Sequence, residues 1–283
     1  MFVFLLAGAS FTGYFIGRYR ENVARAAQAH LTITVVNVGH GEAAWIRTPH
    51  NRFILIGGGP PEAGNRVVES LRQAGAKQID LLVMPYPYAE AIGGIPDIVT
   101  AFPVQSAIEP GGPRVNQVQE AVRELLDSER VPVHMARAGD HQTIDDVVID
   151  VLAPTDPPIQ VDHAAANNSV VMRVGWGDTD FLFAGGIERA GEDALIARSG
   201  AALRADWLRV SRFGTRDASS PEFLRLVSPE CVVVSVGYPN SGGYPHAETL
   251  ARLQESGARL CRTDEATGDL TFSSDGTTVT GPQ

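Results

Sequence analysis

Apolar positions along residues 31–283 follow two different periods, which predicts a chain that mixes strands and helices. In the first half, short runs rich in β-branched residues are typical of strands. An apolar stripe at helical spacing, Val67, Val68 and Leu71, ends at Gly75. A loop is expected over Pro85–Gly94 and a second helix over about Asn116–Ser128. The expected strands are Leu31–Val38, Ala43–Thr48, Arg52–Ile56, Ile79–Met84 and one around Val104–Ile108.

The second half of the chain repeats this succession of expected strands and helices. Two apolar runs flank the turn Gly175–Asp178 and predict a hairpin, and Ser219 or Ser220 is placed to cap a short helix that reaches Val227. The other expected elements are helices over about Glu188–Arg198 and Glu248–Ser256, and strands at Val147–Pro154, Asp206–Val210, Cys231–Val236, Arg259–Thr263 and Leu270–Ser274. Strand pairs followed by alternating strands and helices, in two similar halves, predict an α/β fold with helices outside a sandwich of two sheets. No linker divides residues 31–283 convincingly.

The first 17 residues, Met1–Gly17, carry no charge. Their length is at the lower edge of the roughly 17–25 residues that span a bilayer, and small residues recur along them as on packed transmembrane helices. We predict one membrane anchor followed by a polar stalk over residues 18–30; a cleaved signal peptide and a buried core helix are the alternatives. Arg18, Arg20 and Arg25 favour a cytoplasmic body under the positive-inside rule, and a periplasmic body stays open.

The composition of the chain excludes some classes of function. Acidic residues outnumber basic residues 33 to 23, which gives a formal net charge of −10. This charge opposes attraction to phosphate backbones, so strong nucleic-acid binding is not expected. The two cysteines, Cys231 and Cys261, exclude a disulfide-rich framework and a CxxC motif. The seven histidines would suffice for a two-metal hydrolase, so their positions decide whether such a site is present.

Five segments spread over almost the whole body resemble one family. They are VVNVGHGEA (Val35–Ala43), ILIGGG (Ile54–Gly59), LLVMPYPYAEAIGGIP (Leu81–Pro96), NNSVVMRVGWGDTDFLFAGG (Asn167–Gly186) and LRVSRFGTRDASSPEFL (Leu208–Leu224). Together they resemble the metallo-β-lactamase superfamily, and within it the soluble domain of the bacterial ComEC/Rec2 competence proteins. The resemblance implies a metallo-β-lactamase-like αββα sandwich over residues 31–283, with a two-metal site at the rim between the sheets.

The positions at which that family carries metal ligands hold other residues here. Two zinc ions need about four imidazole or carboxylate ligands each, with one position open for hydroxide. The corresponding positions in this sequence are Gly57, Tyr86, Tyr88, Glu90, Ala91, Gly186, Arg212, Phe213, Tyr244 and His246. Alanine, glycine and phenylalanine side chains offer no ligand, tyrosine is protonated at neutral pH, and arginine is a fixed cation. We therefore predict a degenerate site with no metal, no cofactor and no catalysis, that is, a pseudoenzyme.

The replacements allow two interpretations. Tyr86, Tyr88, Phe213 and Tyr244 could fill the former metal cavity with aromatic rings, or they could form part of a protein-binding surface. For the remaining ligand types, the simpler expectation is that His246 opens a helix and that Glu90 pairs with Arg212. The other histidines lie in scattered positions without ligand spacing.

The function that follows is structural. We expect a non-catalytic, membrane-anchored scaffolding subunit of a larger assembly, with the membrane and integral membrane proteins as partners. The alternative is a ligand or single-stranded nucleic-acid binding protein that uses the old cleft, with Arg173, Arg212 and Arg216 as a local positive patch. A hydrolase with relocated catalytic residues is the third possibility.

Overall fold

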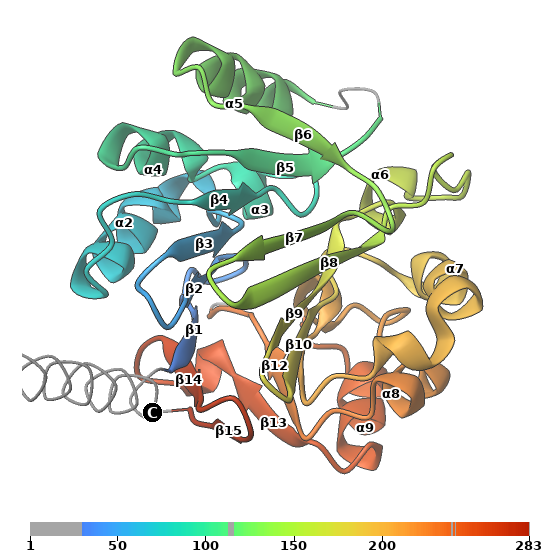
Figure 1. The fold of residues 1–283 in the computed structure, drawn as a ribbon. Coiled ribbons are helices and arrows are strands. Elements are labelled where there is room, and N and C mark those ends of the chain that lie inside the picture. The colour runs from blue at the N-terminus through green and yellow to red at the C-terminus, as the bar shows by residue number, and fades with distance from the viewer. Residues whose placement is uncertain (1–29, 113–115, 239, 241, 283) are drawn as a thin grey trace, which may run out of the picture.

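The computed structural model describes residues 30–112, 116–238, 240 and 242–282. In these residues two mixed β-sheets pack face to face and helices cover both outer faces, as Figure 1 shows. The predicted α/β sandwich is therefore confirmed. The predicted anchor Met1–Gly17 and stalk lie outside the described residues. None of the helices that the structure describes has the length and apolarity that crossing a bilayer requires.

The first sheet holds the ends of the described chain and its first half. Its strands, in spatial order, are β15 (Val279–Thr280), β14 (Leu270–Ser274), β1 (Leu31–Val35), β2 (Ala44–Arg47), β3 (Phe53–Ile56), β4 (Leu81–Val83), β5 (Ala107–Pro110) and β6 (Val133–Ala136). The strands from β3 to β6 run parallel, while β15, β14, β1, β2 and β3 pair antiparallel. Helices α2 (Gly64–Gln73), α3 (Ala89–Ile92), α4 (Ile95–Ala101) and α5 (Gln117–Ser128) cover its outer face.

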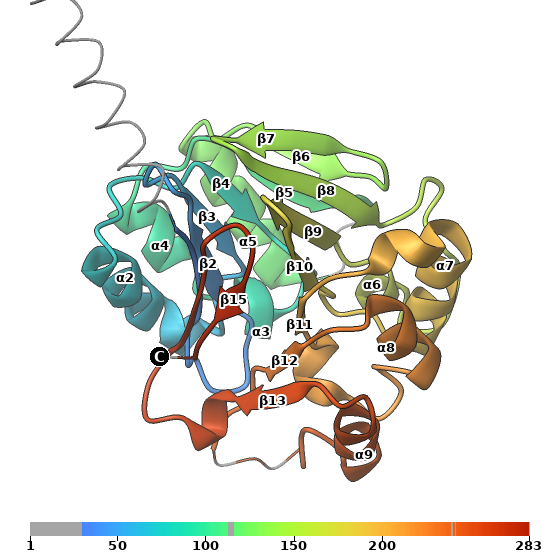
Figure 2. The ribbon, with the colours of Figure 1, turned by 60° about the horizontal axis from the view of Figure 1, so that its bottom comes forward.

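The second sheet is built from the second half of the chain. Its spatial order is β13 (Arg259–Arg262), β12 (Cys231–Val234), β11 (Trp207–Arg209), β10 (Thr179–Phe183), β9 (Val171–Trp176), β8 (Val147–Ala153) and β7 (His141–Ile144). The strands from β10 to β13 run parallel and those from β7 to β10 antiparallel. Helices α6 (Ala164–Asn167), α7 (Arg189–Ser199), α8 (Pro221–Val227) and α9 (Ala247–Glu255) lie on its outer side, as Figure 2 shows from another direction.

Alternation along the strands divides the core into three apolar layers. In β1, Leu31, Ile33 and Val35 point into the layer between the sheets, together with Phe272 of β14. The neighbouring strands send the opposite face, for example Leu55, against the helices. This is the period-two pattern expected where both faces of a sheet are buried.

Several local predictions were confirmed and several were wrong. The hairpin joins β9 and β10, and the hydroxyl of Ser220 accepts a hydrogen bond from Phe223 N at the start of α8, as predicted. The segment Pro85–Gly94, expected to be a loop, contains α3. The strand expected from Val104 begins at Ala107 instead. Strands β6 and β7 were not predicted at all.

Candidate functional site: a degenerate metal centre

The ten sequence-predicted positions gather where parallel strands of both sheets end. Loops after β3 and β4 supply Gly57 through Ala91 from the first sheet, and loops after β10, β11 and β12 supply Gly186 through His246 from the second. The carboxyl ends of parallel strands at a change in chain direction are the usual place for sites in α/β proteins. Val170 N donates to Pro85 O at 2.8 Å, which joins the two loop groups across the sandwich.

Aromatic rings fill the centre of this region. Tyr86 is fully buried and its ring centroid lies 6.0 Å from that of Tyr88. A Cβ atom placed on Gly186 would lie only 2.9 Å from Cδ1 of Tyr86. The tyrosine ring therefore occupies the space that a bridging aspartate at Gly186 would need, which supports the interpretation that the rings fill the old cavity.

A second aromatic cluster closes the other side of the rim. Phe213 is buried, and its ring lies 5.7 Å from the ring of Tyr244, which in turn packs edge-on against His246 at 4.9 Å. His40 contacts both Phe213 and Tyr244 with its ring. His246 precedes the first turn of α9, as expected, and its N–H donates to Gly214 O at 3.0 Å.

Arg212 is held by a carboxylate other than the expected one. Its Nη1 lies 3.1 Å from Oε1 of Glu188, and its guanidinium lies 5.4 Å from the centroid of the Tyr88 ring. The expectation of an Arg212–Glu90 pair was wrong, because the guanidinium pairs with Glu188, the residue just before α7. The backbone of Arg212 and Phe213 adopts positive φ angles of 38° and 63° there. Glu188 also lies 2.8 Å from Nδ1 of His163.

The charged pair at the centre of the region was missed by sequence reasoning. Glu42 and Arg209 are both completely buried, and Nη1 of Arg209 lies 3.3 Å from Oε1 of Glu42. Arg209 Nη1 also donates to Val210 O at 3.0 Å, and the hydroxyl of Ser235 donates to Gly41 O at 2.9 Å. The pair joins the segment before β2 to β11, one from each sheet. Its signal in the sequence was a lone arginine among apolar neighbours in a strand.

Burial dominates the protonation chemistry here. Loss of water raises the pKa of Glu42, and the charge of Arg209 offsets part of this increase. Burial and then the charge of Glu42 hold the pKa of Tyr86 well above its usual range. The Tyr86 phenol therefore stays protonated at physiological pH and is a poor metal ligand.

The remaining positions complete the same packed region. Gly57 adopts φ of +70°, and a Cβ atom there would lie 2.1 Å from Glu42 O, so no aspartate fits on this backbone. Ala91 is buried and its carbonyl accepts a hydrogen bond from Gly58 N at 2.7 Å. The carbonyl of Glu90 accepts from Glu42 N at 2.9 Å.

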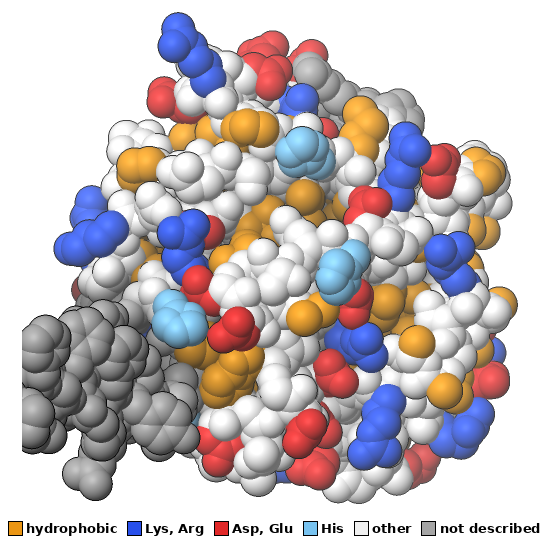
Figure 3. All heavy atoms as spheres, in the orientation of Figure 1, with side chains coloured by type: hydrophobic (Ala, Val, Ile, Leu, Met, Phe, Trp, Pro, Cys, Tyr) orange, Lys and Arg blue, Asp and Glu red, His pale blue; other side chains and the backbone are white. Residues whose placement is uncertain are grey.

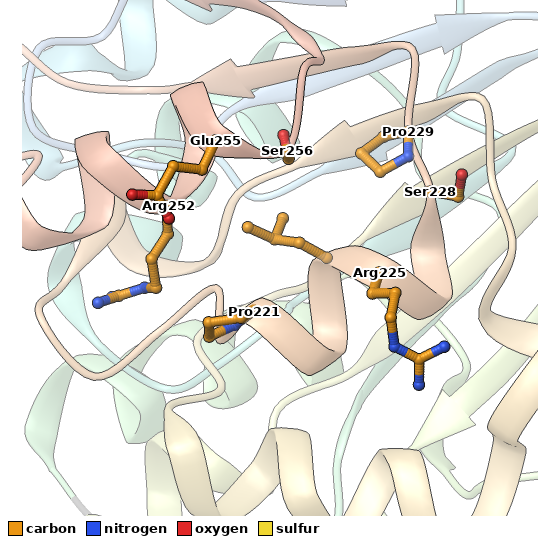
Figure 4. A pocket seen from close by; sticks show the side chains of 8 residues that line it. Pro221, Arg225, Ser228, Pro229, Arg252, Glu255 and Ser256 are labelled. Atoms are coloured by element: carbon orange, nitrogen blue, oxygen red, sulfur yellow. The ribbon is translucent and has the colours of Figure 1, made fainter.

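A two-metal centre does not fit these residues. The region offers a protonated phenol, a methyl group, two glycines without room for a side chain, and the cations Arg209 and Arg212. Its ligand-type residues, Glu42, Glu90 and His246, belong to no cluster of three within the described part of the chain. Among the described residues, no three His, Cys, Asp or Glu side chains lie close enough together to hold a metal ion. A cavity of about 460 Å³ does occur between α8 and α9, where Figure 4 shows Arg225 and Arg252, and none of the ten positions lines it.

The proposed positive patch is neutralised by acidic partners. Arg173 lies 2.9 Å from Asp150, Arg212 pairs with Glu188, and Nε of Arg216 lies 3.1 Å from Glu248. These contacts leave no group of unpaired guanidinium side chains among the three, which weakens the nucleic-acid alternative.

Comparison with solved structures defines the class of protein. YhfI from Bacillus subtilis, a metallo-β-lactamase fold protein, matches 87% of this chain and all of its own chain, with 12% identity and a TM-score of 0.56. CmlA, a diiron β-hydroxylase from Streptomyces venezuelae, matches 86% of this chain and 54% of its own, with 12% identity and a TM-score of 0.55. The chain therefore has the metallo-β-lactamase-like fold.

Sequence comparison points to competence proteins. No family model matches the chain. ComE operon protein 3 of Bacillus subtilis (strain 168) is 27% identical over 255 residues, and Competence protein ComA of Neisseria gonorrhoeae is 28% identical over 276 residues. These alignments cover 82% and 95% of this chain but only 32% and 35% of the relatives. The chain is a homologue of these competence proteins and corresponds to about a third of their length.

Proposed function

We propose that this chain is a non-catalytic structural domain that docks within a membrane assembly of a competence system. The observation that carries the proposal is the packed state of the old metal centre. The Tyr86 ring occupies the space beside Gly186, and the buried Glu42–Arg209 pair joins the two sheets at the same place. Groups that stabilise one another in this way are not arranged to activate water, which a two-metal hydrolase must do.

The first test is chemical. After incubation with excess zinc or manganese and dialysis, we expect the purified protein to hold no stoichiometric metal by mass spectrometry. We also expect no hydrolysis of bis(p-nitrophenyl) phosphate or of a chromogenic lactam. A variant that restores ligand types, Tyr86→His, Tyr88→His, Ala91→His and Gly186→Asp, is the matched control, because it removes the ring that blocks the Gly186 position. Stoichiometric metal with hydrolysis in the unmodified protein would overturn the proposal.

The second test concerns assembly. Purification of the tagged protein from native membranes in mild detergent is expected to bring down integral membrane proteins in fixed ratio. A monomer free of partners would contradict a structural role. The membrane anchor is tested separately by alkaline extraction of membranes, in which a Leu5→Arg/Leu6→Arg variant should be released and the unmodified chain retained, since charge in the apolar run opposes insertion.

A further inference from the structure

Within the part of the chain that the structure describes, the two sheets leave one side of the sandwich uncovered. Strand β6 ends the first sheet and β7 ends the second, and each pairs with a neighbour on one side only. The two strands are joined by residues 137–140, so their open edges lie near each other. An edge strand with unpaired N–H and C=O groups is a template for another strand unless it is covered.

Between these edges a cavity opens at the rim of the apolar layer between the sheets, whose own residues there, such as Ile149 and Ala136, are buried. A cavity of about 380 Å³ lies there, which we call the edge groove. Its lining includes Ile108, Met135 and Ala136 from the first sheet and Gln142, Ile149 and Val151 from the second. His134, on the face of β6 that turns toward the second sheet, is exposed, while Met135 lies opposite Glu109 on the other face. Figure 3 shows hydrophobic side chains in a hollow between the levels of β5 and β7. The groove thus offers apolar surface beside an open edge.

The hairpin on the second-sheet side of the groove is acidic. Residues 138–153 contain four aspartates, Asp140, Asp145, Asp146 and Asp150, and no lysine or arginine. Asp150 is paired with Arg173 and His141, and Asp145 lies 3.8 Å from His50. Arg173 neutralises Asp150, and Arg198 donates to Ala138 O at 3.1 Å. The exposed Asp140 and Asp146 are therefore the carboxylates that can attract a positively charged segment at moderate ionic strength.

We propose that the edge groove binds an extended segment of a partner protein that carries lysine or arginine between apolar residues. The segment adds to β7 as a further strand and places alternate apolar side chains against the groove lining formed by Ile108, Ala136 and Ile149. A second copy of this chain is the poorer occupant, because pairing β7 with itself would bring two acidic hairpins together. This inference rests on the proposed structural function and names the chemistry of its partner.

Peptides of defined chemistry test the groove directly. The probe is a fluorescent, acetylated seven-residue peptide in which lysine alternates with valine, measured by anisotropy against the full chain in detergent. We expect it to bind, with an affinity that falls as salt rises. A peptide with glutamate in place of lysine, and a lysine peptide with alternate backbone amides methylated, should each bind at least about tenfold more weakly, a loss of about 1.4 kcal/mol.

Variants locate the binding surface. His134→Lys and the double variant Asp140→Lys/Asp146→Lys should each weaken the lysine peptide at least about tenfold, because all three side chains are exposed at the groove or along the hairpin that borders it. Thermal unfolding checks that each variant is folded, since the Asp140 carboxylate also accepts a hydrogen bond from Arg137 N. Glu222→Lys/Glu255→Lys, an equal charge change on α8 and α9, is the matched control and should leave binding as it is. If the affinity of the lysine peptide is unchanged in the groove variants, or unchanged by methylation of its backbone amides, the proposal is overturned.

The outcomes also separate this proposal from the structural function. If the groove variants still co-purify with the full membrane assembly, the groove is not the docking site and the structural function stands. If sedimentation shows a dimer that the groove variants abolish, the occupant is a second copy and the partner segment is refuted. Metal-dependent hydrolysis in the unmodified chain would remove the structural function, whatever the peptide does.

Discussion

The degenerate metal centre and the edge groove are both places where the two sheets meet, yet they differ in how the interface is closed. At the metal centre, Glu42, Tyr86 and Arg209 have no measurable exposure. At the edge groove, Met135 is 57% exposed beside a cavity of about 380 Å³. The region of the ten candidate positions is packed, and the edge between β6 and β7 is open.

This difference concerns how the candidate metal-ligand positions are packed. Replacing metal ligands with smaller groups would leave a void, which costs free energy. Buried polar atoms without hydrogen-bond partners also cost free energy, and among the described residues the Tyr86 hydroxyl and Nε of Arg209 are such atoms. In this chain an aromatic ring fills the space next to Gly186, and a buried ion pair links the sheets near the same point. Breaking one partner of a buried pair is strongly destabilising, although an apolar replacement of both partners can be neutral.

The largest expected effect comes from breaking the buried pair. Arg209→Met leaves the carboxylate of Glu42 without its cation in a region closed to water, so we expect a loss of about 3–5 kcal/mol in the free energy of unfolding. Urea unfolding followed by circular dichroism measures this loss. The double variant Glu42→Leu/Arg209→Met should recover most of it.

The matched control is an exposed pair on α7. Arg189 and Asp193 lie 2.8 Å apart and are each more than half exposed, so Arg189→Met should change the free energy of unfolding by no more than about 1 kcal/mol. Equal effects at Arg209 and Arg189 would show that the closed region is not held by its buried charges.

A weaker effect is expected in the pH dependence of the same variant. Arg209 lowers the pKa of Glu42, and burial raises it, so Arg209→Met should raise that pKa further above its unfolded value. The folded variant then binds a proton at higher pH than the unfolded chain, and its stability increases as the pH falls through the folded pKa. Unfolding at about pH 8 and about pH 5 should show a smaller penalty at the lower pH. A Glu42→Gln/Arg209→Met variant has no carboxyl group at position 42, so its stability should not show this pH dependence. Parallel stability profiles for Arg209→Met and the double variant would contradict the role of Glu42.

The space beside Tyr86 gives the next smaller effect. The Cβ atom of Gly186→Ala would lie 2.9 Å from the tyrosine ring and 3.0 Å from Oγ of Ser169. Overpacking of this kind costs about 1–3 kcal/mol. The double variant Tyr86→Leu/Gly186→Ala removes the ring that the new methyl group would contact. It should therefore lose less free energy of unfolding than the two single variants lose in sum. In contrast, Met135→Gln in the open groove should be close to neutral, and thermal unfolding of all four variants checks the comparison.

Sequence patterns predicted the parts of the fold in which burial follows a regular period. Strand β8 alternates fully between buried and half-buried residues, and β12 is a continuous buried run. Both strands were therefore predicted from the sequence. Strands β6 and β7 were missed because they are edge strands with polar, exposed positions, such as His134 and His141. The open edge and the groove between them therefore needed the structure.

The contacts within the candidate site were also only partly predictable from the sequence. The resemblance located the former ligand positions because they follow strand ends in the chain. It did not predict that Glu188, rather than Glu90, holds Arg212, or that Arg209 reaches Glu42 across 167 residues. Ion pairs between loops of different sheets depend on backbone directions that no local pattern encodes.

The smallest effect tests the carboxylate that links the rim loops. Oε2 of Glu188 lies 2.8 Å from Nδ1 of His163, and Oε1 lies 3.1 Å from Arg212. The hydrogen bond to Glu188 and its charge raise the pKa of His163. The contact therefore stabilises the fold below the unfolded histidine pKa of 6.5 and loses its effect as the pH rises through the folded pKa.

Glu188→Gln should therefore lower the pKa of His163, measured by NMR titration of the ring protons. Arg212→Met should raise that pKa, because the nearby guanidinium disfavours a second positive charge. Glu222→Gln, an exposed change on α8, is the control and should not move it. Shifts of opposite sign in the first two variants would show that a carboxylate shared by two cations closes the rim, whereas no shift in either variant would mean that these loops are held by their packing alone.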